Sequence, residues 1–127
     1  MENWTYQCYV DRPQGNLWTD WYKDNPSAQG AHDAAFDQLE QLEAWREPNA
    51  KHIENGDGLI EVKFKAGGVQ WRIFGFYRRG VRRCFVVVAI GNHKGRVYQP
   101  KTVIGSAKQI MKDIGQGTKS AQDCERP

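Results

Sequence analysis

Three consecutive β-strands are predicted by residues 59–90, which read LIEVKFKAGGVQWRIFGFYRRGVRRCFVVVAI. Apolar and charged side chains alternate through Leu59–Lys65, as they do in a strand with one buried face. Gly67 and Gly68 then favour a hairpin turn, because glycine adopts positive φ without a steric cost. Cys84–Ile90 is apolar on both faces, which is typical of a central strand. We therefore expect strands at 59–65, 69–77 and 82–90, joined as an antiparallel meander.

The segments on either side of this meander add one strand and two helices. Residues 5–10 are rich in β-forming residues. Asn25 and Pro26 favour a helix start, and apolar residues then recur every three or four positions as far as Trp45, before Pro48. The same spacing recurs in 103–114. The order β-α-β-β-β-α predicts an α+β fold, with a small, mostly antiparallel sheet, helices packed on one face and a C-terminal helix.

The length of 127 residues suits one domain. We expect that domain to span 1–114 and to be followed by a flexible tail, 115–127, which is polar and glycine-containing. No apolar run approaches the roughly 20 residues of a membrane helix, and the first residues lack a signal-peptide pattern, so we expect a cytoplasmic protein that does not contact membranes. The three cysteines are far apart without a Cys-x-x-Cys motif, and we expect reduced thiols.

Charge is divided unevenly along the chain. Residues 1–57 contain 4 Lys/Arg and 11 Asp/Glu, whereas 58–127 contain 14 and 4. Between Gly58 and Lys112, Glu61 is the single acid among 12 Lys/Arg. This pattern predicts a surface that faces a polyanion. The alternative is that the two halves attract each other across a solvated surface.

The sequence also excludes several kinds of site. It contains no Walker-type loop, dinucleotide-binding glycine pattern, His-Glu-x-x-His motif or paired-cysteine metal site. Nucleotide hydrolysis and metal catalysis therefore have no support, and we expect neither a cofactor nor a bound metal.

Metal-free RNA cleavage needs a base for the 2′-hydroxyl proton, an acid for the leaving 5′-oxygen and fixed cations. His93 is the natural acid or base in the basic segment, because an ordinary histidine titrates near neutrality. Arg72 is a candidate for phosphate, since guanidinium offers a planar fork to two oxygens. The structural alternatives are an exposed loop histidine at position 93 and an ion pair of Arg72 with Glu61 or a helix acid.

The other candidates are basic or aromatic side chains around these two. Lys63 and Lys65 share a strand face, and Lys94, Arg96 and Tyr98 would share one if the strand extends that far. Tyr98 would stack an unpaired base or, alternatively, complete the core. We expect RNA-binding roles for six cations: Lys63, Lys65, Arg82, Arg83, Arg96 and Lys101.

Four segments in this order resemble the phage-derived, HigB-like members of the RelE/ParE toxin superfamily. They are Gly58–Phe64, Trp71–Tyr77, the apolar strand and His93–Pro100, with Ala107 in the helix that follows. The similarity covers about residues 30–113.

The resemblance implies a RelE-like fold and cleavage of messenger RNA in the ribosomal A site. It also implies a cognate antitoxin, for which we expect a helix-turn-helix protein. Arg72 matches the arginine that contacts phosphate, Lys94 the lysine after the last strand, and Tyr98 an aromatic used for stacking or acid-base chemistry. With His93, these form the expected catalytic set. Two alternatives stay open: a non-catalytic nucleic-acid-binding phage or prophage accessory protein, and a ParE-like inhibitor of DNA gyrase.

Overall fold

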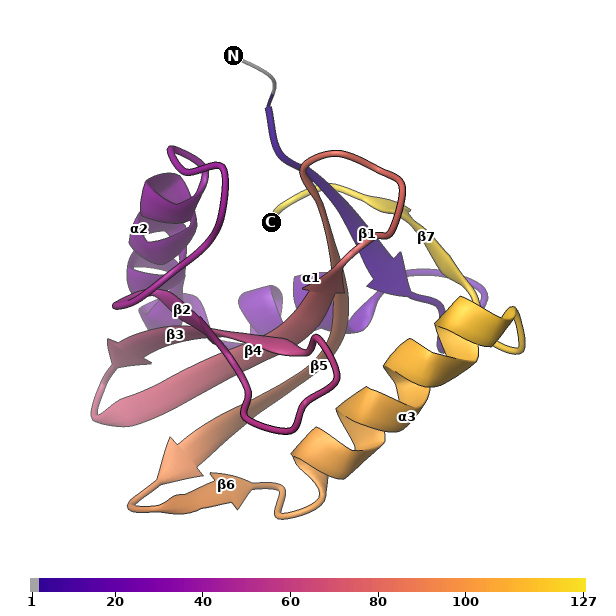
Figure 1. The fold of residues 1–127 in the computed structure, drawn as a ribbon. Coiled ribbons are helices and arrows are strands. Elements are labelled where there is room, and N and C mark those ends of the chain that lie inside the picture. Colours follow the sequence, from indigo (N-terminus) through magenta and orange to yellow (C-terminus); the bar gives the residue numbers. More distant parts are fainter. Residues whose placement is uncertain (1–2) are drawn as a thin grey trace.

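A single sheet organises the chain in a computed structural model that describes residues 3–127 (Figure 1). Its order is β2-β3-β4-β5-β1-β7, and β6 also pairs with β5. β1 runs parallel to β5, and the other pairs are antiparallel. This confirms the predicted α+β class with a mostly antiparallel sheet. The strands are β1 (Thr5–Tyr9), β2 (Ala50–His52), β3 (Ile60–Ala66), β4 (Val69–Tyr77), β5 (Cys84–Lys94), β6 (Val97–Gln99) and β7 (Ala121–Cys124).

The predicted meander is β3, β4 and β5, and a β-bulge within it determines which residues share a face. The register between β4 and β5 shifts between Phe74 and Gly75. A Cβ at position 75 would lie 2.2 Å from the carbonyl oxygen of Val86, so only glycine fits there. Phe74 pairs with Ala89, and the alternation of side chains along β5 changes at this point. As a result, His93 lies on the same face as Phe74.

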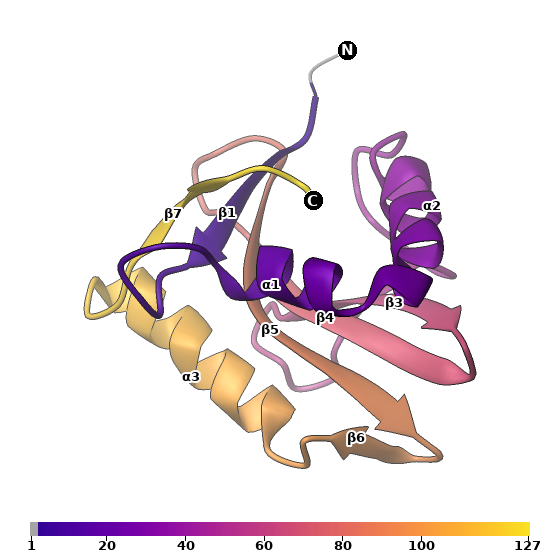
Figure 2. The same ribbon diagram turned by 180° about the vertical axis from the view of Figure 1, so that it is seen from behind.

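The helices cover both faces of the sheet, and the prediction of one covered face is wrong. They are α1 (Leu17–Asp24), α2 (Gln29–Leu39) and α3 (Val103–Gln116), and a 3-10 turn (Pro26–Ala28) joins the first two. The helices α1 and α2 pack in a core cluster with Phe85 and Val87, whereas α3 packs in another with Val86 and Val88. Figures 1 and 2 show α3 on the opposite side of the sheet from α1 and α2. A strand that is apolar on both faces needs both covers.

The first half of the chain departs from the single helix predicted from Pro26 to Trp45. The Trp-rich segment before it is itself α1, and the Asn16 side chain caps that helix by accepting a 2.8 Å hydrogen bond from the Thr19 amide. α2 ends at Leu39. Trp45 lies in the loop that follows, and its side chain is buried in the core. Its ring centroid lies 4.6 Å from that of Phe85. An apolar residue with helical spacing therefore reaches the core without belonging to the helix. Within residues 3–127, no helix is long and apolar enough to cross a membrane.

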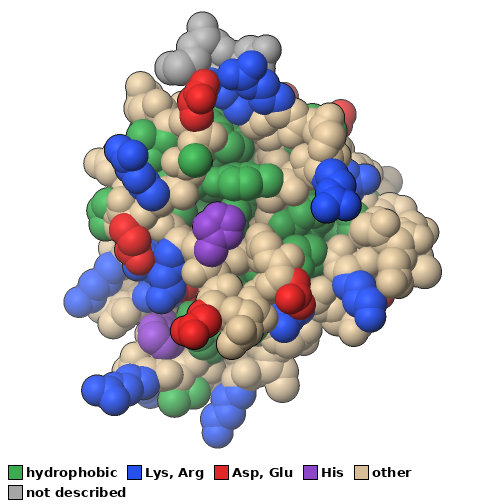
Figure 3. Space-filling view, in the orientation of Figure 1, with side chains coloured by type: hydrophobic (Ala, Val, Ile, Leu, Met, Phe, Trp, Pro, Cys, Tyr) green, Lys and Arg blue, Asp and Glu red, His purple; other side chains and the backbone are tan. Residues whose placement is uncertain are grey.

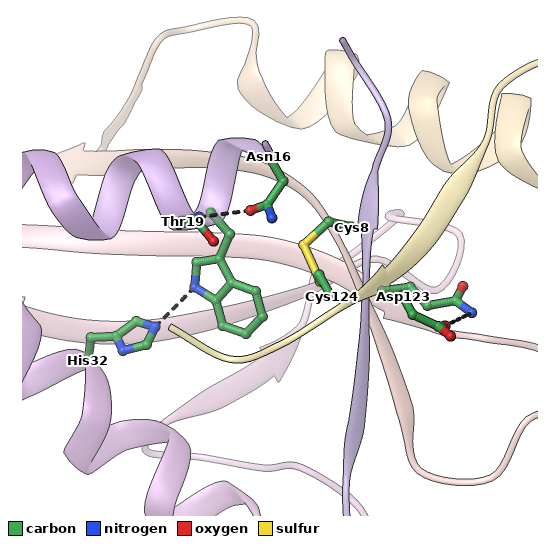
Figure 4. Close-up of a disulfide and its surroundings, with 8 residues drawn as sticks. Cys8, Asn16, Thr19, His32, Asp123 and Cys124 are labelled. Atoms are coloured by element: carbon green, nitrogen blue, oxygen red, sulfur yellow. Dashed lines mark hydrogen bonds between the residues drawn. A yellow bond between two sulfur atoms is a disulfide. The ribbon is translucent and has the colours of Figure 1, made fainter. Parts of the chain in front are cut away.

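The C-terminal segment is part of the sheet. α3 continues to Gln116, and β7 then pairs antiparallel with β1. Cys8 and Cys124 form a disulfide across this pair, with their Cα atoms 5.9 Å apart, while Cys84 is free and buried (Figure 4). The predictions of a flexible tail and of reduced thiols at Cys8 and Cys124 are therefore wrong. A polar edge strand needs little apolar burial when backbone pairing and a covalent link hold it.

Candidate functional site

A buried carboxylate, Glu61, lies at the centre of the residues that the sequence singled out. It is 1% exposed and lies on β3, between β2 and β4 in the sheet. The Tyr98 hydroxyl donates a 2.7 Å hydrogen bond to its Oε2, and Arg72 Nε lies 3.8 Å from the same oxygen. Lys51 Nζ lies 3.7 Å from Oε1. A carboxylate at this depth needs such partners to remain charged.

Sequence reasoning named Glu61 only as an alternative partner for Arg72 and missed its central place. The signal was present, because Glu61 is the single acid among the cations of the basic segment. Its alternation with Ile60 and Val62 placed it on the face expected to be solvated. Tyr98, Arg72 and Lys51 contact the carboxylate on that face, and it is buried there.

Strand pairing brings several of the predicted residues into two adjacent rows on this face, which we call the Glu61 face. One row, paired across the sheet, contains Lys63, Arg72 and Gly91. The row nearer the strand ends contains Lys65, Gln70, His93 and Tyr98. Directly paired residues on neighbouring strands point to the same side. Arg72, His93 and Tyr98 therefore lie on one side of the sheet.

The rings of His93 and Tyr98 stack, with centroids 4.6 Å apart and planes inclined by 26°. Burial, together with the hydrogen bond to Glu61 and the charge of that carboxylate, raises the pKa of Tyr98 to about 12. Tyr98 therefore keeps its proton at neutral pH and serves as a donor. The half-buried His93 side chain forms no hydrogen bond within the described residues, which leaves both ring nitrogens available.

Arg72 is held by its own strand. Its Nη1 donates to the carbonyl oxygen of Trp71 at 2.9 Å and its Nη2 to Gln70 Oε1 at 3.3 Å. Its Nε is buried without a hydrogen-bond partner in the described part of the chain. The ion pair with Glu61 foreseen as the alternative is present. A buried N–H without an acceptor is uncommon in folded proteins.

Three of the predicted RNA-binding cations pair with acids of the first half. Lys63 Nζ lies 2.6 Å from Glu47 Oε2. Glu43 Oε1 lies 3.3 Å from Arg82 Nη2 and 3.0 Å from Arg83 Nη2. Arg82 and Arg83 follow the far end of β4, away from the rows of the Glu61 face. At these three positions, cations of the second half pair with acids of the first half, as the alternative interpretation of the charge pattern expected.

Four other cations, Lys65, Lys94, Arg96 and Lys101, are exposed and form no ion pair within residues 3–127. The chain turns at Gly95, with φ 62°, so Lys94 pairs with Val97 and the strand does not extend through Tyr98. By alternation, Lys94 points away from the side shared by His93 and Tyr98. On the side of the molecule drawn in Figure 3, Lys and Arg are dispersed, with Asp and Glu between them.

No group of three or more His, Cys, Asp or Glu is placed to hold a metal ion anywhere in residues 3–127. No protein-family model, curated protein or solved structure matches the chain. The side chains of the Glu61 face are therefore the basis for a functional proposal.

Proposed function

We propose that this chain is a RelE-like toxin of the HigB type, an endoribonuclease that cleaves messenger RNA on the ribosome without a metal ion. The observation that supports it best is the grouping of His93, Tyr98 and Arg72 on one face around the buried Glu61. The α+β fold is compatible with this proposal. A basic rim of unpaired cations beside the group would hold the RNA backbone.

Each side chain has a defined task in the proposed reaction. His93 takes the proton of the 2′-hydroxyl, whose oxygen then attacks the neighbouring phosphorus. Arg72 binds the phosphoryl oxygens, on which negative charge grows. His93 then passes this proton to the leaving 5′-oxygen, while Tyr98 keeps its own proton on Glu61 and holds the His93 ring by stacking. The products are a 2′,3′-cyclic phosphate and a 5′-hydroxyl end.

Glu61 acts as a positioning residue in this scheme. At 1% exposure, its carboxylate is too buried to touch RNA. It instead holds the hydroxyl group of Tyr98 and the guanidinium group of Arg72. Fixed side chains of this kind lower the cost of reaching a reactive geometry.

The proposal places the protein in the cytoplasm, with ribosome-bound messenger RNA and a helix-turn-helix antitoxin as partners. Cytoplasmic thiols are kept largely reduced by glutathione and thioredoxin. The disulfide between Cys8 and Cys124 lies on β1 and β7, outside the Glu61 face. The proposed activity therefore should not depend on this bond.

The test is induced expression in bacteria, with messenger 5′ ends mapped within minutes. New 5′ ends inside translated codons are expected for the native chain. The Arg72→Ala/His93→Ala variant should not produce them, while Lys23→Gln, an exposed change on α1, should behave as the native chain does. Growth arrest with intact messenger would contradict the proposal, and stalled replication in that case would favour gyrase inhibition.

A second candidate is a non-catalytic nucleic-acid-binding protein. The four exposed cations without ion pairs favour it, because phosphate binding requires no acid-base group. Purified protein would then bind single-stranded RNA in a salt-sensitive way and leave the RNA intact. RNA that acquires 2′,3′-cyclic phosphate ends would exclude this candidate.

A further inference from the structure

A pocket of about 880 Å³ lies at the other end of the sheet from the row of Lys65 and His93. Its walls are α3, the end of β4 with the turn that follows, and the loop before β3. Its lining residues lie on the same side of the sheet as Glu61, but none of them belongs to the two rows of Lys63 and Lys65. Its volume falls within the range of about 300–1,000 Å³ that small-molecule sites occupy.

The floor of this pocket is apolar. Phe76 from β4 and Met111 and Ile114 from α3 line it, and all three belong to the α3 side of the core. Phe76 and Met111 remain partly exposed. In Figure 3, hydrophobic side chains reach the surface of this side of the molecule, with Lys and Arg around them. A flat organic group would find a matching surface here.

The rim of the pocket is basic. Arg78, Arg79 and Lys112 line it and form no ion pair within the described residues, whereas Lys108 is engaged by Asp57 at 3.4 Å. Three cations without carboxylate partners around one apolar floor favour a ligand that carries more than one negative charge.

The helix wall leaves room for a ligand. Gly105 and Gly115 line the pocket, and a Cβ built at either position would meet no atom within 4 Å. Both lie in α3, with no positive φ, so larger residues could be introduced there without backbone strain.

From these features we propose that the pocket binds a nucleoside phosphate, with the base against Phe76 and Met111 and the phosphate between Arg78, Arg79 and Lys112. An inorganic anion would leave the apolar floor unused. A fatty acid carries a single charge and would leave most of the rim unpaired. The nucleotide is either free or one unit of an RNA chain. This inference does not depend on RNA cleavage at the Glu61 face.

The chain offers a direct probe, because it contains 2 methionines and Met111 lines the pocket. Protein labelled with ¹³C at the methionine methyl groups should give two signals, and Met111→Leu assigns one of them. Adenosine monophosphate should shift the Met111 signal saturably. Adenosine and inorganic pyrophosphate should bind at least roughly tenfold more weakly, because each lacks half of the recognised groups. An adenylate tetranucleotide that binds more tightly than the monophosphate would identify RNA as the source, and equal affinity would identify a free nucleotide.

Two variants with matched controls complete the test. Gly115→Leu should fill the pocket and abolish the shift, whereas Gly30→Leu on α2, also free of contacts at the Cβ, should leave it intact. Arg79→Gln should weaken binding by roughly tenfold, and Lys23→Gln should not. An unmoved Met111 signal at millimolar monophosphate would overturn the inference, as would a shift that survives Gly115→Leu. Native-like circular dichroism confirms that each variant is folded.

Discussion

The hydroxyl group of Tyr98 on β6 donates a 2.7 Å hydrogen bond to Glu61, a carboxylate on β3 that is only 1% exposed. β6 pairs with β5 alone, so this bond joins residues 37 positions apart that no backbone ladder connects directly. It ties the hairpin of β5 and β6 to β3. The same bond fixes the ring on which His93 stacks.

Replacing Tyr98 by phenylalanine should lower the free energy of unfolding by about 1–3 kcal/mol. The substitution retains the ring but removes a donor from a buried carboxylate, which is then less well satisfied. Urea denaturation measures the change. Tyr9→Phe is the matched control, because the Tyr9 hydroxyl forms no hydrogen bond in residues 3–127. Equal stability of the two variants would show that the bond to Glu61 contributes nothing.

Unfolding should become easier as the pH falls below about 6.5, because of His32. This side chain is fully buried, and its Nε2 accepts a 3.0 Å hydrogen bond from Trp18 Nε1, so the ring must be neutral (Figure 4). Burial lowers its pKa, and the neighbouring Asp33 opposes the shift only in part. The unfolded chain therefore binds a proton that the folded chain does not. Stability is fully present above the unfolded pKa and declines below it, by at most about 1.4 kcal/mol per pH unit.

Urea midpoints measured from pH 7.5 to pH 5 test this dependence. His32→Phe keeps an aromatic ring among Trp21, Phe36 and Phe64, so it should fold with lower stability and lose the slope between about pH 6.5 and 5.5. His52→Phe, an exposed change on β2, should retain it. A slope that persists without His32 would assign the pH dependence to another group.

The parts of the fold that local patterns encode could be predicted. The alternation in Leu59–Lys65 and the double glycine at 67–68 located β3 and its hairpin because neighbouring residues determine both. Pairings between distant segments could not be predicted. The pairing of β7 with β1 joins the two ends of the chain, and the disulfide within it joins residues 116 positions apart. Nothing in the polar composition of the last residues indicates such a partner.

The candidate site likewise combines features that local sequence patterns predict with features that depend on distant segments. Arg72, His93 and Tyr98 share a face, but this depends on the bulge at Gly75, which reverses the alternation along β5. Counting residues from Cys84 would have placed His93 on the wrong side. Segregation of charge along the chain also did not predict segregation in space, because Glu43 and Glu47 fold back onto the basic strands.

Cations differ in their expected contribution to RNA binding according to whether they are paired. Lys94→Ala/Arg96→Ala should weaken binding to a single-stranded oligonucleotide and reduce the slope of log affinity against log salt by about 1.4, or 0.7 per lost phosphate contact. Arg82→Ala should change the slope little, because Arg82 pairs with Glu43 and lies away from the Glu61 face. Fluorescence anisotropy at several salt concentrations measures both variants. Equal slopes would remove Lys94 and Arg96 from the binding surface.

Loss of the disulfide should destabilise the chain without abolishing the proposed activity. The bond closes a loop across 116 positions, and opening it should lower the free energy of unfolding by roughly 2–5 kcal/mol through greater freedom of the unfolded chain. Urea denaturation with and without dithiothreitol measures this. The reductant should not affect Cys8→Ser/Cys124→Ser, while Cys84→Ala should still respond to it, because Cys84 is unpaired. Messenger cleavage by the double serine variant should equal that of the native chain, since cytoplasmic thiols are reduced already. In the urea measurement, equal stability of the native chain with and without reductant would contradict a structural role for the disulfide. Loss of cleavage in a folded double variant would show that the Glu61 face needs β7 in place.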